Sequence, residues 1–236
     1  MGGLDRLRDG LFTLLFPRLC LGCERAIGAD QDDLLCAGCY ATLLPTGHWE
    51  TAENALTDRL AGHFPYVTAA ALFTYRAPSL VQRVIHALKY HGRAQIGYGL
   101  GRTLGRRLGE QPLLADLAAV VPVPLHPRRQ RARGYNQAEV IARGVGEARR
   151  LPVRTDLLRR TNFRGSQTKL SRLERMDNVD RSFAAVAGRA LPAAAHLLLV
   201  DDVITTGATL DACANHLLAA YPGCRLSVAA LAVTEH

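Results

Sequence analysis

An apolar run at residues 197–200 ends in two adjacent carboxylates, Asp201 and Asp202, and a Thr-Thr-Gly-Ala-Thr turn follows. This feature constrains the fold most, because a short apolar run bounded by a turn is typical of a buried strand. A helical pattern at residues 208–220 begins directly after the turn. A buried strand that leads into a helix is the repeating unit of α/β folds.

The same alternation of strand and helix extends back to residue 66. We expect strands at residues 66–75, 117–123, 197–200 and 225–233, a short strand within 153–160, and helices at 80–90, 96–110, 136–150 and 208–220. This pattern predicts an α/β fold with a mostly parallel sheet flanked by helices. Residues 161–182 are polar and rich in arginine, and they predict a long loop with a short helix, which in a compact domain is usually functional.

The 236 residues suffice for one α/β domain with a small appendage. We expect an N-terminal unit at residues 1–47, formed by a helix at 4–16 and a four-cysteine segment, then a linker at 48–65 and the main domain at 66–236. No apolar run is long enough to span a bilayer. The N-terminal apolar run is also too short for a signal peptide, so we expect a cytoplasmic protein.

Four cysteines form two C-x-x-C pairs separated by twelve residues: Cys20, Cys23, Cys36 and Cys39. Four thiolates suit tetrahedral Zn²⁺ and close its coordination sphere, which predicts a structural rather than a catalytic zinc site. Two disulfides fit poorly with a cytoplasmic chain. An iron–sulfur cluster and a redox use are the remaining alternatives.

The turn after residue 202 has the chemistry of a phosphate site. A helix N-terminus offers free N–H groups and the positive end of a dipole, and Gly207 allows close approach of the backbone to an anion. Thr205, Thr206 and Thr209 add hydroxyl donors. The two carboxylates would repel a phosphate, so they suit hydroxyls or a metal ion at the other end of a sugar phosphate. Helix capping and a solvated strand end are the simpler explanations of each part taken alone.

The positive charge of the chain is concentrated in one region. The formal net charge is +8, and residues 128–181 alone carry a net +9. Lys89 and Lys169 are the only lysines, so arginine supplies nearly all of this charge. A GC-rich genome would explain the abundance of arginine but not its clustering. Such a cluster favours phosphate-bearing partners.

The conjunction of apolar strand, Asp-Asp and Thr-Thr-Gly-x-Thr resembles the signature of type I phosphoribosyltransferases, which bind phosphoribosyl pyrophosphate (PRPP). The glycines at residues 97–105 do not form a dinucleotide-binding motif. Three further segments resemble the ComF family of competence-associated proteins: residues 86–92 (His-Ala-Leu-Lys-Tyr-His-Gly), 121–139 (beginning Val-Pro-Val-Pro-Leu-His-Pro-Arg-Arg) and 160–178. The four-cysteine, zinc-ribbon-like module also fits that family.

The resemblance implies roles for particular residues. Asp201, Asp202 and Lys89 would act at the reacting end of PRPP, with Mg²⁺. A flexible lid at residues 161–178 would cover the ligand. The implied PRPP contacts are Asp201, Asp202, Val203, Thr205, Thr206, Gly207, Ala208, Thr209, Pro124, Leu125, His126, Arg128 and Lys169. The candidates for DNA contacts are Arg129, Arg131, Arg133, Arg164, Arg172 and Arg175. A solvated helix end for Lys89 and an incidental loop histidine for His126 are the simpler alternatives.

Two functions of different class remain open from the sequence. A ComF-like protein would bind PRPP and single-stranded DNA and act in DNA uptake during natural transformation, in contact with the uptake machinery. A metabolic phosphoribosyltransferase would instead transfer ribose-5-phosphate to a nucleobase or amine, with a purely structural zinc module. A PRPP-sensing regulator without catalysis is a third reading. The sequence does not identify an acceptor or decide whether the fold is used for catalysis.

Overall fold

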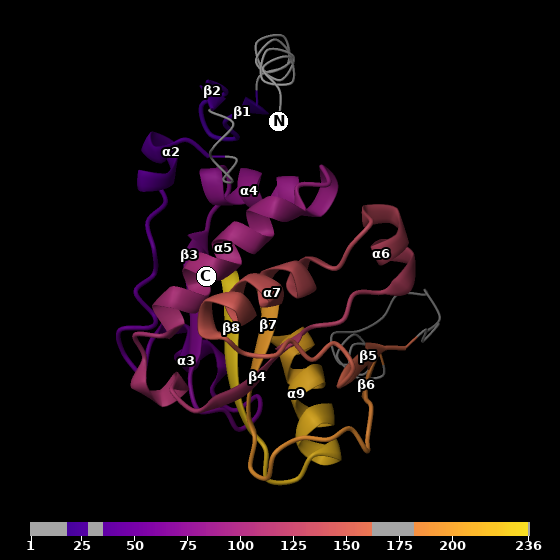
Figure 1. The fold of residues 1–236 in the computed structure, drawn as a ribbon. Coiled ribbons are helices and arrows are strands. Elements are labelled where there is room, and N and C mark those ends of the chain that lie inside the picture. The colour runs from indigo at the N-terminus through magenta and orange to yellow at the C-terminus, as the bar shows by residue number, and fades with distance from the viewer. Residues whose placement is uncertain (1–17, 28–34, 162–181, 236) are drawn as a thin grey trace, which may run out of the picture.

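The computed structural model describes residues 18–27, 35–161 and 182–235. At its centre lies a sheet of four parallel strands in the order β3–β8–β7–β4 (Figure 1). The strands are β3 (Ala69–Tyr75), β4 (Leu117–Pro122), β7 (His196–Ile204) and β8 (Arg225–Thr234). A parallel bridge between Val120 and Val153 adds a short fifth partner beside β4. The α/β class and the parallel sheet predicted from the sequence are confirmed.

Helices cover both faces of this sheet, because its central strands are apolar on both sides. Along β7, Leu198 and Val200 pack into the core on one face, and Leu197 and Leu199 pack into the core on the other. The first face is covered by α4 (Leu80–Tyr90), α5 (Ala94–Leu108) and α7 (Gln137–Arg149). The second is covered by α3 (Ala55–Leu60) and α9 (Ala208–Ala220).

The bounds of α4 and α9 agree with the predicted helices at residues 80–90 and 208–220. Ser79 is the N-cap of α4, and its hydroxyl accepts a hydrogen bond from the Gln82 N–H, which fixes the start of the helix. β7 is longer than predicted, because Asp201, Val203 and Ile204 continue the pairing with β8. The two carboxylates therefore lie within the strand rather than after it.

Helices α5 and α7 approach each other closely through glycines. A Cβ atom on Gly101 would lie 2.3 Å from the Ile141 carbonyl oxygen, and one on Gly144 would lie 2.2 Å from the Tyr98 carbonyl oxygen. Neither carbonyl could move away without displacing its helix. The glycines that weaken the helical pattern of residues 96–110 thus serve helix packing.

The N-terminal module consists of a hairpin, β1 (Arg18–Leu19) with β2 (Ala26–Ile27), and the short helix α2 (Ala37–Ala41). Figure 1 shows this module beside α4. Cys20, Ile27 and Leu35 belong to the same buried cluster as Val84 and Leu88 of α4. The module therefore packs directly on the main domain. The helix predicted at residues 4–16 lies outside the described residues.

The expected linker at residues 48–65 differs in the structure. It contains α3, whose N-cap Asn54 accepts hydrogen bonds from the Leu56 and Thr57 N–H groups. Leu56 and Leu60 are fully buried under the sheet. Just before α3, the Thr46 N–H donates to the Leu72 carbonyl and the Asn54 side-chain amide donates to the Ala69 carbonyl, so the segment covers the edge of β3.

The predicted strand at residues 153–160 is shorter, β5 (Leu158–Arg160), and pairs antiparallel with β6 (Phe183–Ala185). Two further short elements are α6 (Pro127–Arg133) and the 3-10 helix η1 (Pro112–Leu114). Most of the loop predicted at residues 161–182 lies outside the described residues. Across the part of the chain that the structure describes, no helix is both long and apolar enough to cross a membrane.

Candidate functional site

The candidate site lies at the carboxyl ends of β4 and β7. These two strands are neighbours, with Pro122 paired to Val200. The chain leaves β4 through α7 toward Val153 on one side, and leaves β7 through α9 toward β8 on the other side. This reversal of strand order is the position at which open α/β sheets bind ligands.

Asp201 and Asp202 differ although they are adjacent. Asp201 Oδ1 accepts a hydrogen bond of 2.8 Å from the Asp202 N–H. Burial is the main reason that the pKa of Asp201 is raised to about 7, and the Asp202 carboxylate adds to it. Lys89 and Arg160 act in the opposite direction. Asp201 therefore ionises less readily than an ordinary aspartate.

Lys89 and Asp202 form an ion pair, with 3.1 Å between Nζ and Oδ2. The pair is partly shielded, since 26% of the Lys89 side chain and 13% of the Asp202 side chain are exposed. The predicted site residue Lys89 therefore reaches the strand-end carboxylates from the end of α4, and it is not simply a solvated helix end. A cation held here can contact an anionic group of a ligand that sits over the strand ends.

The threonine-rich turn encloses a small hollow of about 40 Å³ at the start of α9, bordered by Asp201 and by residues 203–210. Gly207 is the N-cap of α9 with φ +84°, a left-handed conformation that other residues adopt only with strain. A Cβ atom there would also lie 2.8 Å from Leu60 Cδ2. The residues of the first turn of α9 border this hollow, and the Ala208 N–H donates to Thr206 Oγ1 at 3.5 Å. The N-terminus of a helix is suited to phosphate.

Helix α3 contacts the threonine-rich turn through Arg59 and Leu60. Arg59 Nη1 donates to the Thr205 carbonyl at 3.3 Å and to Thr234 Oγ1 at 3.4 Å. Leu60 contacts the turn beside Gly207. Neither Arg59 nor Leu60 was predicted from the sequence, although the Asn54–Thr57 capping box is a signal for a helix start.

After β4 the chain passes Pro124, Leu125 and His126 and enters α6. His126 caps α6, because its Nδ1 accepts a hydrogen bond of 3.1 Å from the Arg128 N–H. At the far end of this segment, the Asn136 side-chain amide donates to the Val123 carbonyl at 2.9 Å, which ties the start of α7 to the end of β4. Asn136 and Val123 therefore hold both ends of the α6 segment beside the strand ends.

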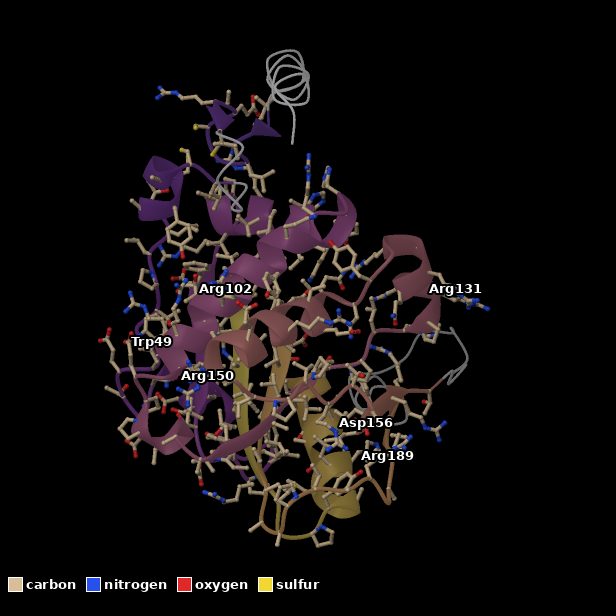
Figure 2. The ribbon with its side chains drawn as sticks, viewed as in Figure 1. Trp49, Arg102, Arg131, Arg150, Asp156 and Arg189 are labelled. Atoms are coloured by element: carbon tan, nitrogen blue, oxygen red, sulfur yellow. The ribbon has the colours of Figure 1, made fainter. Side chains whose placement is uncertain are left out.

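The arginines of α6 take different positions. Arg129 and Arg133 line a groove of about 670 Å³ together with Lys89 and Tyr90. Arg131 is exposed and points away from the sheet in Figure 2. The other predicted ligand residues in this region, Arg164, Lys169, Arg172 and Arg175, lie outside the described residues.

The four cysteines of the N-terminal module come together. Their sulfur atoms all lie within 4.8 Å of one another, and Cys23 Sγ and Cys36 Sγ are 3.7 Å apart. Tetrahedral zinc with Zn–S bonds of about 2.3 Å separates two ligand sulfurs by roughly 3.8 Å. All four cysteines are free thiols, so the donor set and its spacing fit a tetrahedral thiolate site.

The electrostatics of this cluster also fit a cation. Burial opposes ionisation of Cys20, but N–H donors from Cys36, Cys23 and Gly22 outweigh it and lower its pKa to about 6. Burial and then the neighbouring thiols raise the pKa of Cys39 to about 12. Four thiolates at this distance repel one another, and a metal ion among them removes that repulsion.

The class of protein follows from the fold and from a family comparison. Residues 133–234 match the phosphoribosyl transferase domain family. This match covers α7, the β5–β6 pair, β7, α9 and β8, and therefore includes Asp201, Asp202 and the threonine-rich turn.

Three similar proteins indicate more specifically which proteins this chain resembles. DNA utilization protein YhgH of Escherichia coli (strain K12) is 29% identical over 210 residues, which span 85% of this chain and 84% of that protein. Competence protein ComFC of Streptococcus pneumoniae is 27% identical over 77% of this chain and 80% of its own length. Competence protein F of Haemophilus influenzae is 34% identical over 93 residues, 39% of this chain and 41% of that protein. These similarities, together with the phosphoribosyl transferase domain, confirm the resemblance to ComF-family proteins that the motifs predicted.

Proposed function

We propose that this chain is a ComF-like competence protein that binds PRPP and handles single-stranded DNA during natural transformation, in contact with the DNA-uptake machinery. The observation that carries the PRPP part is the Lys89–Asp202 ion pair beside the threonine-rich turn. The DNA part is supported by the names of the relatives and by the exposed arginines of α6.

In this proposal the 5′-phosphate of PRPP lies on the N–H groups of Thr206, Gly207, Ala208 and Thr209, with the hydroxyls of Thr205 and Thr206 as additional donors. Val203 lines the same hollow. Asp201 and Asp202 accept hydrogen bonds from the ribose hydroxyls. Lys89 neutralises charge on the diphosphate from the opposite side of the strand ends.

The diphosphate extends toward the end of β4. Pro124, Leu125 and His126 form the loop there, and Arg128 is placed at the start of α6. Lys169 is proposed as a contact from the lid. Mg²⁺, held by the ligand and the two carboxylates, would neutralise diphosphate charge and stabilise it as a leaving group.

A metabolic phosphoribosyltransferase is the second candidate, favoured by the presence of both carboxylates and Lys89 at one place. In that reaction the bond from the anomeric carbon to the diphosphate breaks as the acceptor binds that carbon. Lys89 would stabilise the charge left on the diphosphate, and Asp201 and Asp202 would stabilise positive charge on the ribose. Release of pyrophosphate in the presence of nucleobase or amine acceptors distinguishes this candidate from a PRPP sensor.

For the four-cysteine cluster we propose one structural Zn²⁺ held by Cys20, Cys23, Cys36 and Cys39. It would fix the hairpin β1–β2 against α2 and leave no open position for catalysis. A cytoplasmic location belongs to the same proposal, because free thiols persist in a reducing compartment. Elemental analysis should find about one zinc per chain. Cys36→Ser should release it while the sheet remains folded, and metal-free protein with intact thiols would contradict the assignment.

For DNA we propose that Arg129, Arg131 and Arg133 of α6 bind phosphates, together with Arg164, Arg172 and Arg175. Neutralising about four phosphates predicts a slope of roughly −3 for log K against log salt. PRPP should compete for binding if these arginines also hold its diphosphate.

Three measurements test the whole proposal. Calorimetry with PRPP and Mg²⁺ should show binding to the wild type. Oligonucleotide binding should weaken in the double variant Arg131→Glu/Arg133→Glu, and a matched variant with the exposed Arg76→Glu should bind as the wild type does. Transformation frequency in a deletion strain complemented with each variant should follow the DNA affinity. Normal transformation without the gene would reject the competence role.

A further inference from the structure

Two grooves lie on either side of the end of α4. The first, of about 670 Å³, is lined by Lys89, Tyr90, Gly92, Arg129, Ala132 and Arg133 and separates α4 from α6. The second, of about 310 Å³, is lined by residues of α4, by His91 and Arg93, and by Leu21 of the N-terminal module. The end of α4 thus lies between the α6 groove and the cysteine module, as Figure 1 also shows.

Rings and planar cations connect these two grooves. His86 and Tyr90 are one helical turn apart, and their ring centroids lie 4.6 Å from each other. His91 lies 5.4 Å from His86, centroid to centroid. On the other side, the Arg133 guanidinium lies 5.2 Å from the centre of the Tyr90 ring. The order Arg133, Tyr90, His86, His91 therefore forms a row of stacking groups, which we call the α4 row.

The α4 row is accessible and its surroundings are basic. The Tyr90 residue is 62% exposed, which is unusual for a large aromatic side chain. Arg83, His86, His91 and Arg93 are exposed as well. Arg133 is held in place by a hydrogen bond of 2.9 Å from its Nη1 to Gln137 Oε1. No described residue that lines either groove is acidic.

We infer that the α4 row is a binding track for single-stranded DNA, in which a base stacks on Tyr90 and the backbone passes from the α6 arginines toward the cysteine module. The inference rests on the proposed handling of DNA and assigns to it a surface that extends from the α6 arginines onto α4. Phosphates would contact Arg129 and Arg133 at one end and Arg93 at the other.

Single strands fit this surface better than a duplex. Unpaired bases present their faces, and an aromatic ring binds any base by stacking, with arginine guanidinium groups adding to it. In a duplex the base faces are already stacked, and Tyr90 would have nothing to bind. The arrangement contains exposed rings beside planar cations rather than a set of base-reading amides, so little sequence preference is expected.

The test compares two labelled strands of equal length and charge: an oligothymidine, and the same backbone with abasic residues. The wild type should bind oligothymidine about tenfold more tightly, because only that strand can stack. Tyr90→Ala should remove this preference by weakening oligothymidine binding, with abasic binding changed by less than about twofold. Tyr90→Phe should retain the preference, because the ring remains.

Two controls separate stacking from charge and from folding. Tyr98→Ala removes another exposed tyrosine, from α5, which lines neither groove as described, and should behave as the wild type. Arg93→Gln should weaken both strands and reduce the salt slope by about 0.7, the contribution of one phosphate on a single strand. Circular dichroism and PRPP affinity should be unchanged in all four variants.

The outcomes distinguish this inference from the proposed function. If the wild type binds both strands equally, or if Tyr90→Ala retains the preference, the α4 row is not the track, and DNA handling by the α6 arginines still stands. If the wild type binds neither strand at low salt, the proposed handling of DNA fails together with this inference.

Discussion

The two ends of the parallel sheet each carry an acidic group beside a cation, but they use them differently. At the carboxyl end, Asp202 pairs with Lys89 next to the turn at the start of α9. At the amino end, Asp116 accepts hydrogen bonds from His196 and Arg225. The residues at the carboxyl end border a groove and a small hollow. The residues at the amino end instead hydrogen-bond to one another.

At the amino end of the sheet, both ring nitrogens of His196 have hydrogen-bond partners. His196 Nδ1 donates to Asp116 Oδ1 at 2.7 Å, and His196 Nε2 lies 2.9 Å from Ser227 Oγ. An Asp–His–Ser series of this kind could suggest a nucleophile, but Ser227 is fully buried and no substrate could reach it. Hydrogen-bond partners and solvent access, not residue types, therefore distinguish the proposed binding end of the sheet from its structural end.

The largest expected effect is a loss of stability at the amino end of the sheet. His196→Ala should lower the free energy of unfolding by about 2–4 kcal/mol, because it leaves a cavity and removes the buried partner of Ser227. Urea unfolding measures this loss. Calorimetry on the folded variant should give a wild-type affinity for PRPP, and a parallel loss of affinity would mean that the two ends are not independent.

At the carboxyl end of the sheet, Asp202→Asn should weaken PRPP binding but leave the stability almost unchanged. PRPP affinity should fall by about 1.5–3 kcal/mol, because hydrogen bonds to a charged group are lost. The free energy of unfolding should change by less than about 1 kcal/mol, since a partly exposed ion pair contributes little. Asp58→Asn, an exposed carboxylate on α3, is the matched control and should change neither quantity.

The hydroxyl of Thr206 tests the phosphate end of the same site. Thr206→Val should reduce PRPP affinity by about 1–3 kcal/mol through loss of one donor. Thr206 is exposed, so stability should be almost unchanged. The exposed loop variant Thr51→Val serves as control. Equal PRPP affinity in both variants would exclude Thr206 from the ligand contacts.

The smallest effect concerns acid stability at the structural end. Hydrogen bonds first from His196 and then from Arg225 lower the pKa of Asp116 to about 2, against an ordinary value of 3.8. Its lowered pKa stabilises the folded state above pH about 4, and this stabilisation is lost as the pH falls through about 2. Because Asp116→Asn cannot titrate, its difference from wild type should shrink over this range. A difference independent of pH would contradict the assignment.

The local parts of the fold could be predicted because their signals lie within a few residues. Ser79 and Gly207 mark the starts of α4 and α9, and the apolar run at 197–200 predicts the core of β7. The cover of the β3 edge by residues 45–54 could not be predicted, because it depends on hydrogen bonds to a strand whose partners are set by tertiary structure.

The candidate site shows the same limit. The residues of the turn and the four cysteines were identifiable from their spacing. The support of Gly207 by Leu60 and of Thr205 by Arg59 was not, because these contacts join segments far apart in the chain. The Tyr90–Arg133 contact was missed for the same reason.

The close approach of α5 and α7 limits how the sequences of these two helices can change. The spacing of these helices depends on Gly101 and Gly144 together, so a larger residue at one position must be accompanied by an adjustment at the other. The chain enters α7 directly from α6 through Gly134, so a shift of α7 would be transmitted to the arginines of α6. Substitutions buried between the two helices could therefore change the nucleic-acid affinity proposed for these arginines during evolution, while the surface sequence stays the same.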